Sequence, residues 1–137
     1  MKVFLGGTCN GSTWRDELIL MLNMDYFNPV VKDWTMACQA EEVKQREECD
    51  YCLYVITPKM TGVYSIAEAV DDSVKRGYKT IFCYLMQDGE ATFTEAQRKS
   101  IHQTARMIRE NGAYSCASLV EIAELLSALD VVARYAS

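Results

Sequence analysis

The residue best placed for chemistry in this chain is Glu68. Residues 50–72 read as a buried strand, a loop with proline and glycine, and a helix that carries Glu68 in its first turn. Open α/β sheets bind their ligands in the crevice at the carboxyl edge of the strands, which is where such a helix begins. If the chain is an enzyme, Glu68 is therefore the expected catalytic residue.

The spacing around Glu68 also fits a purely structural role. Ser65 stands three residues before Glu68 and matches the S-x-x-E capping box, in which both side chains satisfy backbone N–H groups at a helix start. The same position near a helix N-terminus keeps a carboxylate ionised, as a nucleophile requires. The spacing alone leaves both interpretations open.

Asp50 is the second candidate for a catalytic role. It opens the most apolar strand of the chain, where a charged group needs a partner or a task. Asp50 is therefore a candidate functional residue.

The segment Gly6-Gly7-Thr8 follows the first predicted strand and precedes a helix. Glycines there let backbone amides approach a phosphate or a sugar, and Thr13 and Arg15 could contact an anion. The segment lacks both the GxGxxG pattern and the GK[ST] ending, so a dinucleotide site or a nucleoside-triphosphatase loop is not indicated. A tight strand-to-helix turn that needs glycine is the equal alternative.

A polar loop follows the second predicted strand at the same edge of the sheet. Asn28 and Asp33 could hydrogen-bond a heterocycle, and Trp34 could stack on it. The alternative is an ordinary turn at Asn28-Pro29, with Trp34 anchoring the loop.

The six cysteines do not predict a metal site or a disulfide framework. Cys49 and Cys52 have CxxC spacing, but no second pair of cysteines or histidines stands at metal-ligand spacing, and His102 is the only histidine. Reduced thiols in a cytoplasmic protein are the expectation, with no metal and no cofactor.

Length and charge limit the classes of function. The 137 residues suit one domain, and the net charge of −5 argues against binding a nucleic acid polymer or an anionic membrane. No apolar run approaches the roughly 20 residues that cross a bilayer. A small molecule is the expected partner.

Strand and helix patterns alternate along the chain. We predict strands over residues 2–5, 26–27, 51–56, 80–85 and 113–116, and helices over residues 13–22, 36–48, 65–76, 94–111 and 118–134. This alternation predicts an α/β domain over residues 1–137, with a parallel sheet of about five strands and helices on both faces.

Three segments resemble one known family. The runs VFLGGT, DYCLYVITP and GVYSIAEAVDDS are similar to motifs of the nucleoside 2-deoxyribosyltransferase-like proteins, closest to a small bacterial and phage branch, with the deoxynucleoside 5'-monophosphate N-glycosidases among its relatives. The resemblance implies a flavodoxin-like three-layer sandwich and a homodimer or larger assembly.

The resemblance also implies a chemistry and a set of site residues. It implies cleavage of an N-glycosidic bond or deoxyribosyl transfer, with Glu68 as the nucleophile that forms a covalent deoxyribosyl ester. Asp50 would protonate or bind the departing base. The substrate, a nucleoside or nucleotide, would lie among Gly6, Gly7, Thr8, Asn28, Asp33, Trp34, Gly62, Tyr64 and Ser65.

The chain departs from the family pattern in its first strand and in the loop before Glu68. Phe4 stands where the transferases have a tyrosine, and Gly62 stands where they have an aspartate. Tyr64 could replace the missing phenol. No residue near Cys116 or Ser118 matches the one that a neighbouring subunit supplies in the family. These departures keep open a nucleotide-binding or sequestering protein that has lost the chemistry, and a flavodoxin-like interaction domain.

Overall fold

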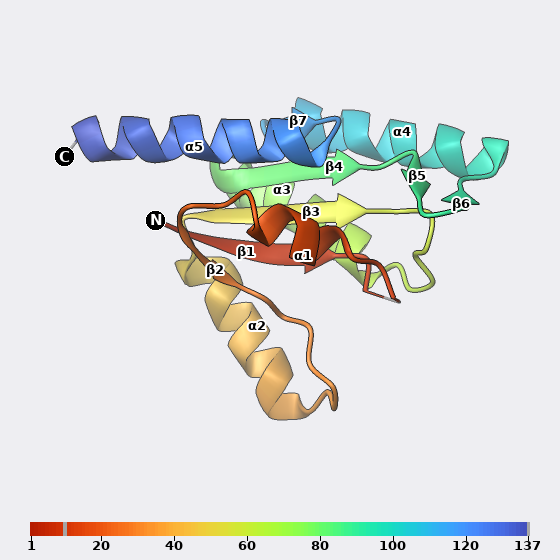
Figure 1. The fold of residues 1–137 in the computed structure, drawn as a ribbon, viewed down its shortest axis with the longest axis horizontal. Coiled ribbons are helices and arrows are strands. Elements are labelled where there is room, and N and C mark those ends of the chain that lie inside the picture. The colour runs from red at the N-terminus through yellow and green to blue at the C-terminus, as the bar shows by residue number, and fades with distance from the viewer. Residues whose placement is uncertain (10, 137) are drawn as a thin grey trace.

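A five-stranded parallel sheet forms the centre of the molecule (Figure 1). The computed structural model describes residues 1–9 and 11–136. The strand order is β2-β1-β3-β4-β7, and every neighbouring pair is parallel. The strands are β1 (Lys2–Gly7), β2 (Asp25–Phe27), β3 (Tyr51–Ile56), β4 (Thr80–Tyr84) and β7 (Tyr114–Cys116). This is the flavodoxin-like order, and the predicted α/β fold class is confirmed.

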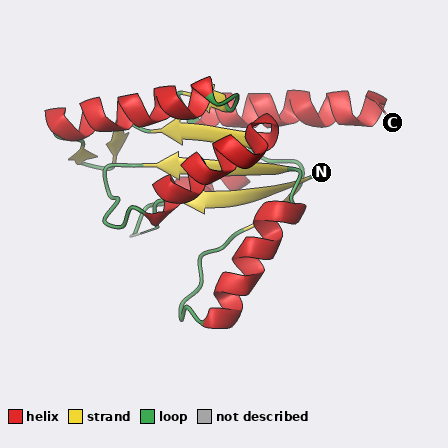
Figure 2. Cartoon of the chain, turned by 180° about the vertical axis from the view of Figure 1, so that it is seen from behind, coloured by secondary structure: helices red, strands yellow, loops and turns green. Residues whose placement is uncertain are grey.

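Helices cover both faces of this sheet (Figures 1 and 2). One apolar core lies between the sheet and the helices α1 (Trp14–Ile19) and α5 (Leu119–Ala136). The other core lies between the sheet and the helices α3 (Tyr64–Arg76) and α4 (Glu95–Glu110). Consecutive residues of β3 point into opposite cores, as strand geometry requires, and this explains why the strand is apolar throughout.

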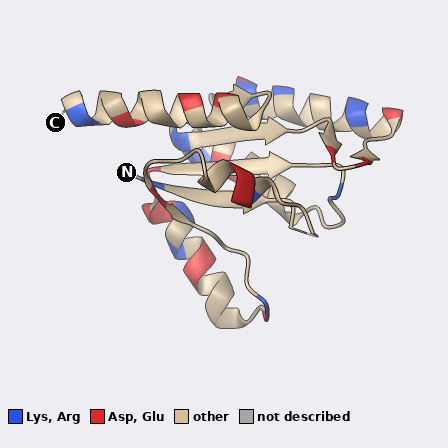
Figure 3. Ribbon diagram, viewed as in Figure 1, with Lys and Arg blue, Asp and Glu red and all other residues tan. Residues whose placement is uncertain are grey.

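The helix α2 (Met36–Glu48) is peripheral and extends away from the sheet (Figures 1 and 2). The hydroxyl of Thr35 caps its start, and Met36 there is 75% exposed. Only its last turns are buried, at Gln45 and Arg46. In the ribbon of Figure 3 the charged residues are coloured, and they lie on α2 and the other helices, whereas the strands carry almost none.

The connections differ from the prediction in three places. The first helix ends at Ile19 instead of residue 22, because Leu20 and Met21 already turn toward solvent. A short 3-10 helix, η1 (Gly77–Lys79), joins α3 to β4. A small antiparallel hairpin of β5 (Gln87–Asp88) and β6 (Ala91–Thr92) follows β4, with its turn at Gly89. Among the described residues no helix is both long and apolar enough to span a bilayer.

Candidate functional site

Two adjoining cavities lie at the carboxyl ends of β1 and β3. The chain leaves β1 toward the α1 face and leaves β3 toward the α3 face, so these strands mark the topological switch point where open α/β sheets bind ligands. The glutamate cavity has a volume of about 140 Å³ and is lined by Phe4, Gly6, Gly7, Cys9, Arg15, Pro29, Glu42, Tyr64, Ser65 and Glu68. The loop cavity has a volume of about 250 Å³ and is lined by Gly7, Thr8, Cys9, Ile56, Met60, Thr61, Gly62, Tyr64 and Ser65.

The side chain of Glu68 faces the glutamate cavity and does not cap its own helix. Helix α3 begins at Tyr64, which puts Glu68 in the second turn, and the helix start has no side-chain cap. The hydroxyl of Ser65 donates instead to the carbonyl oxygen of Gly7, at 3.3 Å. The capping-box interpretation is therefore wrong, and so is the placement of Glu68 in the first turn.

Arg46 fixes the position of Glu68 from the neighbouring helix α2. Its guanidinium lies 3.4 Å from a carboxylate oxygen of Glu68. The same group lies 3.2 Å from Asp71 and 2.8 Å from the fully buried Asp72. Burial is the largest single effect and opposes the charged form of Arg46, but the hydrogen bond to Asp72 and the charges of Asp72 and Glu68 together raise the pKa above its ordinary value. Tyr54 also donates its hydroxyl proton to Asp72.

Burial makes Glu68 a weaker acid than an ordinary glutamate. Its side chain is 10% exposed, and this desolvation raises the pKa of Glu68 to about 7. The positive charge of Arg46 works against that rise, whereas the negative charges of Glu42 and Asp72 add to it. A carboxyl group that changes its charge near neutral pH suits both nucleophilic and acid–base chemistry.

The two glycines after β1 are needed by the packing of the sheet. A Cβ atom on Gly7 would lie 2.0 Å from the carbonyl oxygen of Val55, and Gly7 has a φ of +125°. A Cβ on Gly6 would lie 2.7 Å from the ring of Tyr54. The structural alternative for these glycines is therefore correct, and their backbone forms one wall of the glutamate cavity.

Arg15 holds the loop after β1 in place. Its side chain is buried and donates to the carbonyl oxygens of Leu5, Gly7 and Thr8 at 2.9, 3.1 and 2.7 Å. The hydroxyl of Thr8 accepts a hydrogen bond from the backbone N–H of Thr57 at 2.9 Å. An anion contact at Arg15 stays a prediction: its side chain lines the glutamate cavity, and its guanidinium is engaged by the backbone that shapes the site.

Comparison with known protein families supplies one match. The family described as nucleoside 2-deoxyribosyltransferase like matches residues 1–86, which is more than half of the chain. The chain belongs to this family. Comparison with curated proteins and with solved structures gave no match.

The family match covers every residue that lines the two cavities at the switch point. A larger cavity, of about 350 Å³, lies outside the switch point beside Tyr84 and Cys116. The carboxylate that lines this larger cavity is that of Glu121, and it already accepts a hydrogen bond from the backbone N–H of Ala117 at the start of α5. We therefore place the candidate active site of this deoxyribosyltransferase-like protein at the switch point.

Most of the predicted site residues do gather there. Predicted residues that line one or both cavities are Gly6, Gly7, Thr8, Gly62, Tyr64, Ser65 and Glu68. Phe4, which replaces a family tyrosine, also lines the glutamate cavity.

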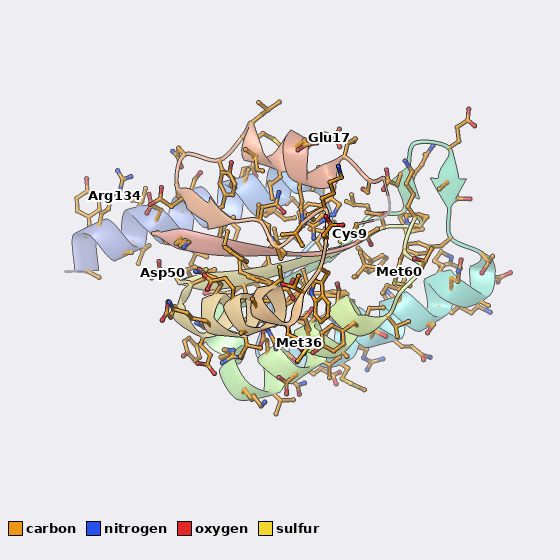
Figure 4. The ribbon with its side chains drawn as sticks, turned by 90° about the horizontal axis from the view of Figure 1, so that it is seen from below. Cys9, Glu17, Met36, Asp50, Met60 and Arg134 are labelled. Atoms are coloured by element: carbon orange, nitrogen blue, oxygen red, sulfur yellow. The ribbon has the colours of Figure 1, made fainter. Side chains whose placement is uncertain are left out.

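Asp50 does not share the site with Glu68. It precedes β3 at the amino edge of the sheet, where a carboxylate oxygen accepts a hydrogen bond from the backbone N–H of Lys2 at 2.7 Å. The strand between Asp50 and the switch point spans five residues to Val55, which is roughly 16 Å at the usual rise per residue. Figure 4 shows Asp50 well away from Cys9 and Met60, which line the cavities. The prediction that Asp50 acts on the same substrate as Glu68 is therefore wrong. Asp50 precedes β3 and Glu68 follows it, so the two residues lie at opposite edges of the sheet.

The loop after β2 contributes a different residue from those predicted. Asn28 is exposed, and its side-chain oxygen accepts from the backbone N–H of Val30, as in an ordinary turn. Asp33 and Trp34 are exposed and line neither cavity. Pro29 is the residue of this loop that reaches the glutamate cavity.

The cysteines show no arrangement typical of redox or metal chemistry. All six are free, and burial raises the pKa of Cys52 to about 12. In the described ranges, residues 1–9 and 11–136, no group of three or more histidine, cysteine, aspartate or glutamate side chains could hold a metal ion.

Two charged residues at the site, Glu42 and Arg46, were not predicted from the sequence. Both come from α2, whose polar and charged sequence indicates an exposed helix. The one available signal was their spacing of four residues, which places the two side chains on one face of the helix.

Proposed function

We propose that this deoxyribosyltransferase-like protein breaks the N-glycosidic bond of a deoxynucleoside or its 5'-monophosphate through a covalent deoxyribosyl ester of Glu68. The observation that supports the proposal best is the position of Glu68. It is a buried carboxylate at the switch point, held by Arg46, in a cavity at the sheet edge where such folds bind their ligands.

The proposed reaction has two displacements. In the first, a carboxylate oxygen of Glu68 attacks the anomeric carbon, and the electron pair of the C–N bond leaves with the base, which takes up a proton. In the second, water or another base attacks the same carbon, and the bond to Glu68 breaks to restore the carboxylate. The sugar lies beside Glu68, and the loop cavity holds another part of the nucleoside or nucleotide.

The preorganisation of Glu68 supports this role. Arg46 draws the side chain away from its helix and toward the cavity, so the carboxylate does not need to reorient when substrate binds. Tyr64 lines both cavities and is 63% exposed, so its phenol is available to contact a sugar hydroxyl.

A sequestering protein is the alternative function. Phe4 lines the glutamate cavity in place of a tyrosine and has no hydroxyl, and Gly62 lines the loop cavity in place of an aspartate and has no carboxylate. Binding of a nucleotide without turnover would follow from these two replacements. The homodimer or larger assembly implied by the family resemblance stays a prediction under either function.

The deciding experiment measures base release from a panel of deoxynucleosides and deoxynucleoside 5'-monophosphates. We expect the wild type to release the base from at least one of them, and Glu68→Ala to be slower by at least about 10³-fold because the nucleophile is lost. Rapid acid quench and mass spectrometry should find the deoxyribosyl ester on the peptide that contains Glu68.

The matched control is Glu124→Gln, which removes an exposed carboxylate of α5 far from the cavities. It should release base at the wild-type rate. Equal turnover by wild type and Glu68→Ala would overturn the proposal. Tight nucleotide binding by both proteins, without base release, would establish the sequestering function instead.

A further inference from the structure

Helix α2 brings a second carboxylate to the glutamate cavity. Glu42 lies one helical turn before Arg46, and residues four apart occupy the same face of a helix. Arg46 contacts Glu68 directly, so the adjacent position on that face also points toward Glu68. Both glutamates line the same cavity of about 140 Å³. Of the described residues that line the two cavities at the switch point, these are the two carboxylic acids.

The surroundings of Glu42 favour its protonated form. The side chain is half-buried, and this burial raises the pKa of Glu42, although a hydrogen bond from Trp34 and the charge of Arg46 oppose the rise. Glu42 in turn contributes to the raised pKa of Glu68. Two carboxyl groups that share a small cavity titrate as a pair, so the singly protonated form dominates over an intermediate range of pH.

The positive charge of Arg46 favours the ionised form of both glutamates, and its guanidinium contacts Glu68. Arg46 lies 3.4 Å from Glu68, an ion-pair distance. The proposed cleavage requires the form in which Glu68 is ionised beside Arg46 and Glu42 carries the proton. This distribution gives one nucleophile and one acid, as a retaining displacement at an anomeric carbon requires.

We propose that Glu42 is the general acid and base of the reaction, and that it works opposite Glu68 across the glutamate cavity. The proposal rests on the proposed function, because it assigns the proton transfers of that same reaction. It also fills the role left vacant by Asp50, which lies at the other edge of the sheet.

The proton transfers balance in both displacements. As Glu68 attacks the anomeric carbon, the carboxyl group of Glu42 gives its proton to the base nitrogen that receives the electron pair of the C–N bond. The carboxylate of Glu42 then takes a proton from the attacking water. The new C–O bond forms as the ester bond to Glu68 breaks, which returns Glu42 to its acid form and Glu68 to its carboxylate form.

The test compares two leaving groups in the Glu42→Gln variant. One substrate is the natural deoxynucleoside that the wild type cleaves, whose base needs a proton. The other is 4-nitrophenyl 2-deoxyribofuranoside, whose phenolate leaves without one. We expect Glu42→Gln to slow base release about 10²- to 10⁴-fold, while its first displacement with the nitrophenyl substrate stays within a few-fold of the wild-type rate. The first displacement is read from the burst of 4-nitrophenolate.

Two further variants separate chemistry from structure. Glu41→Gln removes the neighbouring, exposed carboxylate of α2 and should leave both rates unchanged. Trp34→Phe removes the hydrogen bond that lowers the pKa of Glu42, so the basic limb of the pH profile should move to higher pH. That limb should disappear in Glu42→Gln.

The outcomes also distinguish this proposal from the proposed function. Equal slowing of Glu42→Gln on the two substrates, or no slowing on either, would overturn the role of Glu42 while Glu68 stays the nucleophile. A wild type that cleaves neither substrate, or a Glu68→Ala variant as active as the wild type, would overturn the proposed function and this proposal with it.

Discussion

Glu68 meets two opposing requirements at once. Burial beside Arg46 orients its carboxylate at the glutamate cavity, as the proposed chemistry needs, but burial also makes the charged form costly. A residue retained for reactivity at the expense of stability is a common feature of active sites. The cost of the buried charge can be measured with Glu68→Gln, which replaces the carboxyl group by an uncharged amide of the same shape.

We predict that Glu68→Gln is more stable than the wild type at pH 8 and about equal to it at pH 4.5. The pKa of Glu68 is about 7 in the folded protein and ordinarily 4.5. Between these values the folded state binds more protons than the unfolded state, so the free energy of unfolding of the wild type falls as pH rises. The loss is about 3 kcal/mol at 1.36 kcal/mol per pKa unit. Urea unfolding at several pH values checks it, and parallel pH curves for the two proteins would contradict it.

At the residue scale the sequence placed Glu68 and its neighbours at the correct edge of the sheet, and placed Asp50 at the wrong one. Glu68, Gly62 and Ser65 follow β3 directly, so the order along the chain fixes the edge at which they lie. The position of Asp50 was wrong because this residue opens β3 and therefore lies at the amino edge of the sheet, opposite the edge of Glu68. Glu42 was missed because its place depends on how α2 docks, which no local pattern encodes.

At the scale of elements, one ionic network joins α2 to the body of the molecule. Arg46 reaches from α2 to three carboxylates of α3, and one of them, Asp72, is fully buried. Asp72 also pairs with Arg76 at 2.8 Å. The rest of α2 is largely exposed, so this network, together with the hydrogen bonds from Lys79 to the carbonyl oxygens of Glu47 and Cys49, places the helix and, with it, Glu42.

We predict that Arg46→Met destabilises the protein by about 3–5 kcal/mol, the usual cost of removing one partner from a buried ion pair. Asp72 would keep only Arg76 and the hydroxyl of Tyr54. Loss of the positive charge would also raise the pKa of Glu68 further, so the acid limb of the pH–rate profile should move to higher pH. Urea unfolding and the pH profile measure these effects.

The control for Arg46→Met is Lys44→Met, which removes a charge from an exposed position of α2. Equal unfolding free energies for the two variants would show that the network does not hold the helix. Arg46→Lys keeps the positive charge but lacks the planar guanidinium that bonds several carboxylates at once. Compared with Arg46→Met, it should therefore restore the wild-type pH profile more fully than the wild-type stability.

The order and type of the main elements could be predicted because each has a strong periodic pattern. The strand predicted over residues 51–56 and the helix predicted over residues 36–48 have the observed bounds. The hairpin of β5 and β6 was missed because each strand has only two residues. Asp88 of this hairpin accepts from Thr57 at 2.7 Å, a long-range contact that the local sequence does not show.

At the scale of the whole molecule, the family match covers fewer residues than the fold does. The match ends at residue 86, whereas α4, β7 and α5 complete both faces and one edge of the sheet. Residues beyond the match supply large buried side chains to each core, including Ile101, Ile108, Ile122 and Leu126. The residues that line the two cavities therefore lie within the family match, whereas part of the apolar core that supports them comes from residues beyond it.

We predict that residues 1–86 do not fold alone and that the full chain unfolds as one domain. Loss of the four buried side chains removes about 6–12 kcal/mol of hydrophobic stabilisation at roughly 1.5–3 kcal/mol each. That loss is comparable with the whole stability of an ordinary domain, about 5–15 kcal/mol. Removing residues 87–137 would also expose the outer edge of β4 and both faces of the sheet.

Circular dichroism and proton NMR dispersion of residues 1–86 should show a disordered fragment, and calorimetry of the full chain should give one cooperative transition. A fragment that melts cooperatively would instead show that the family-matched segment is a domain by itself, and that α4, β7 and α5 are an addition to it.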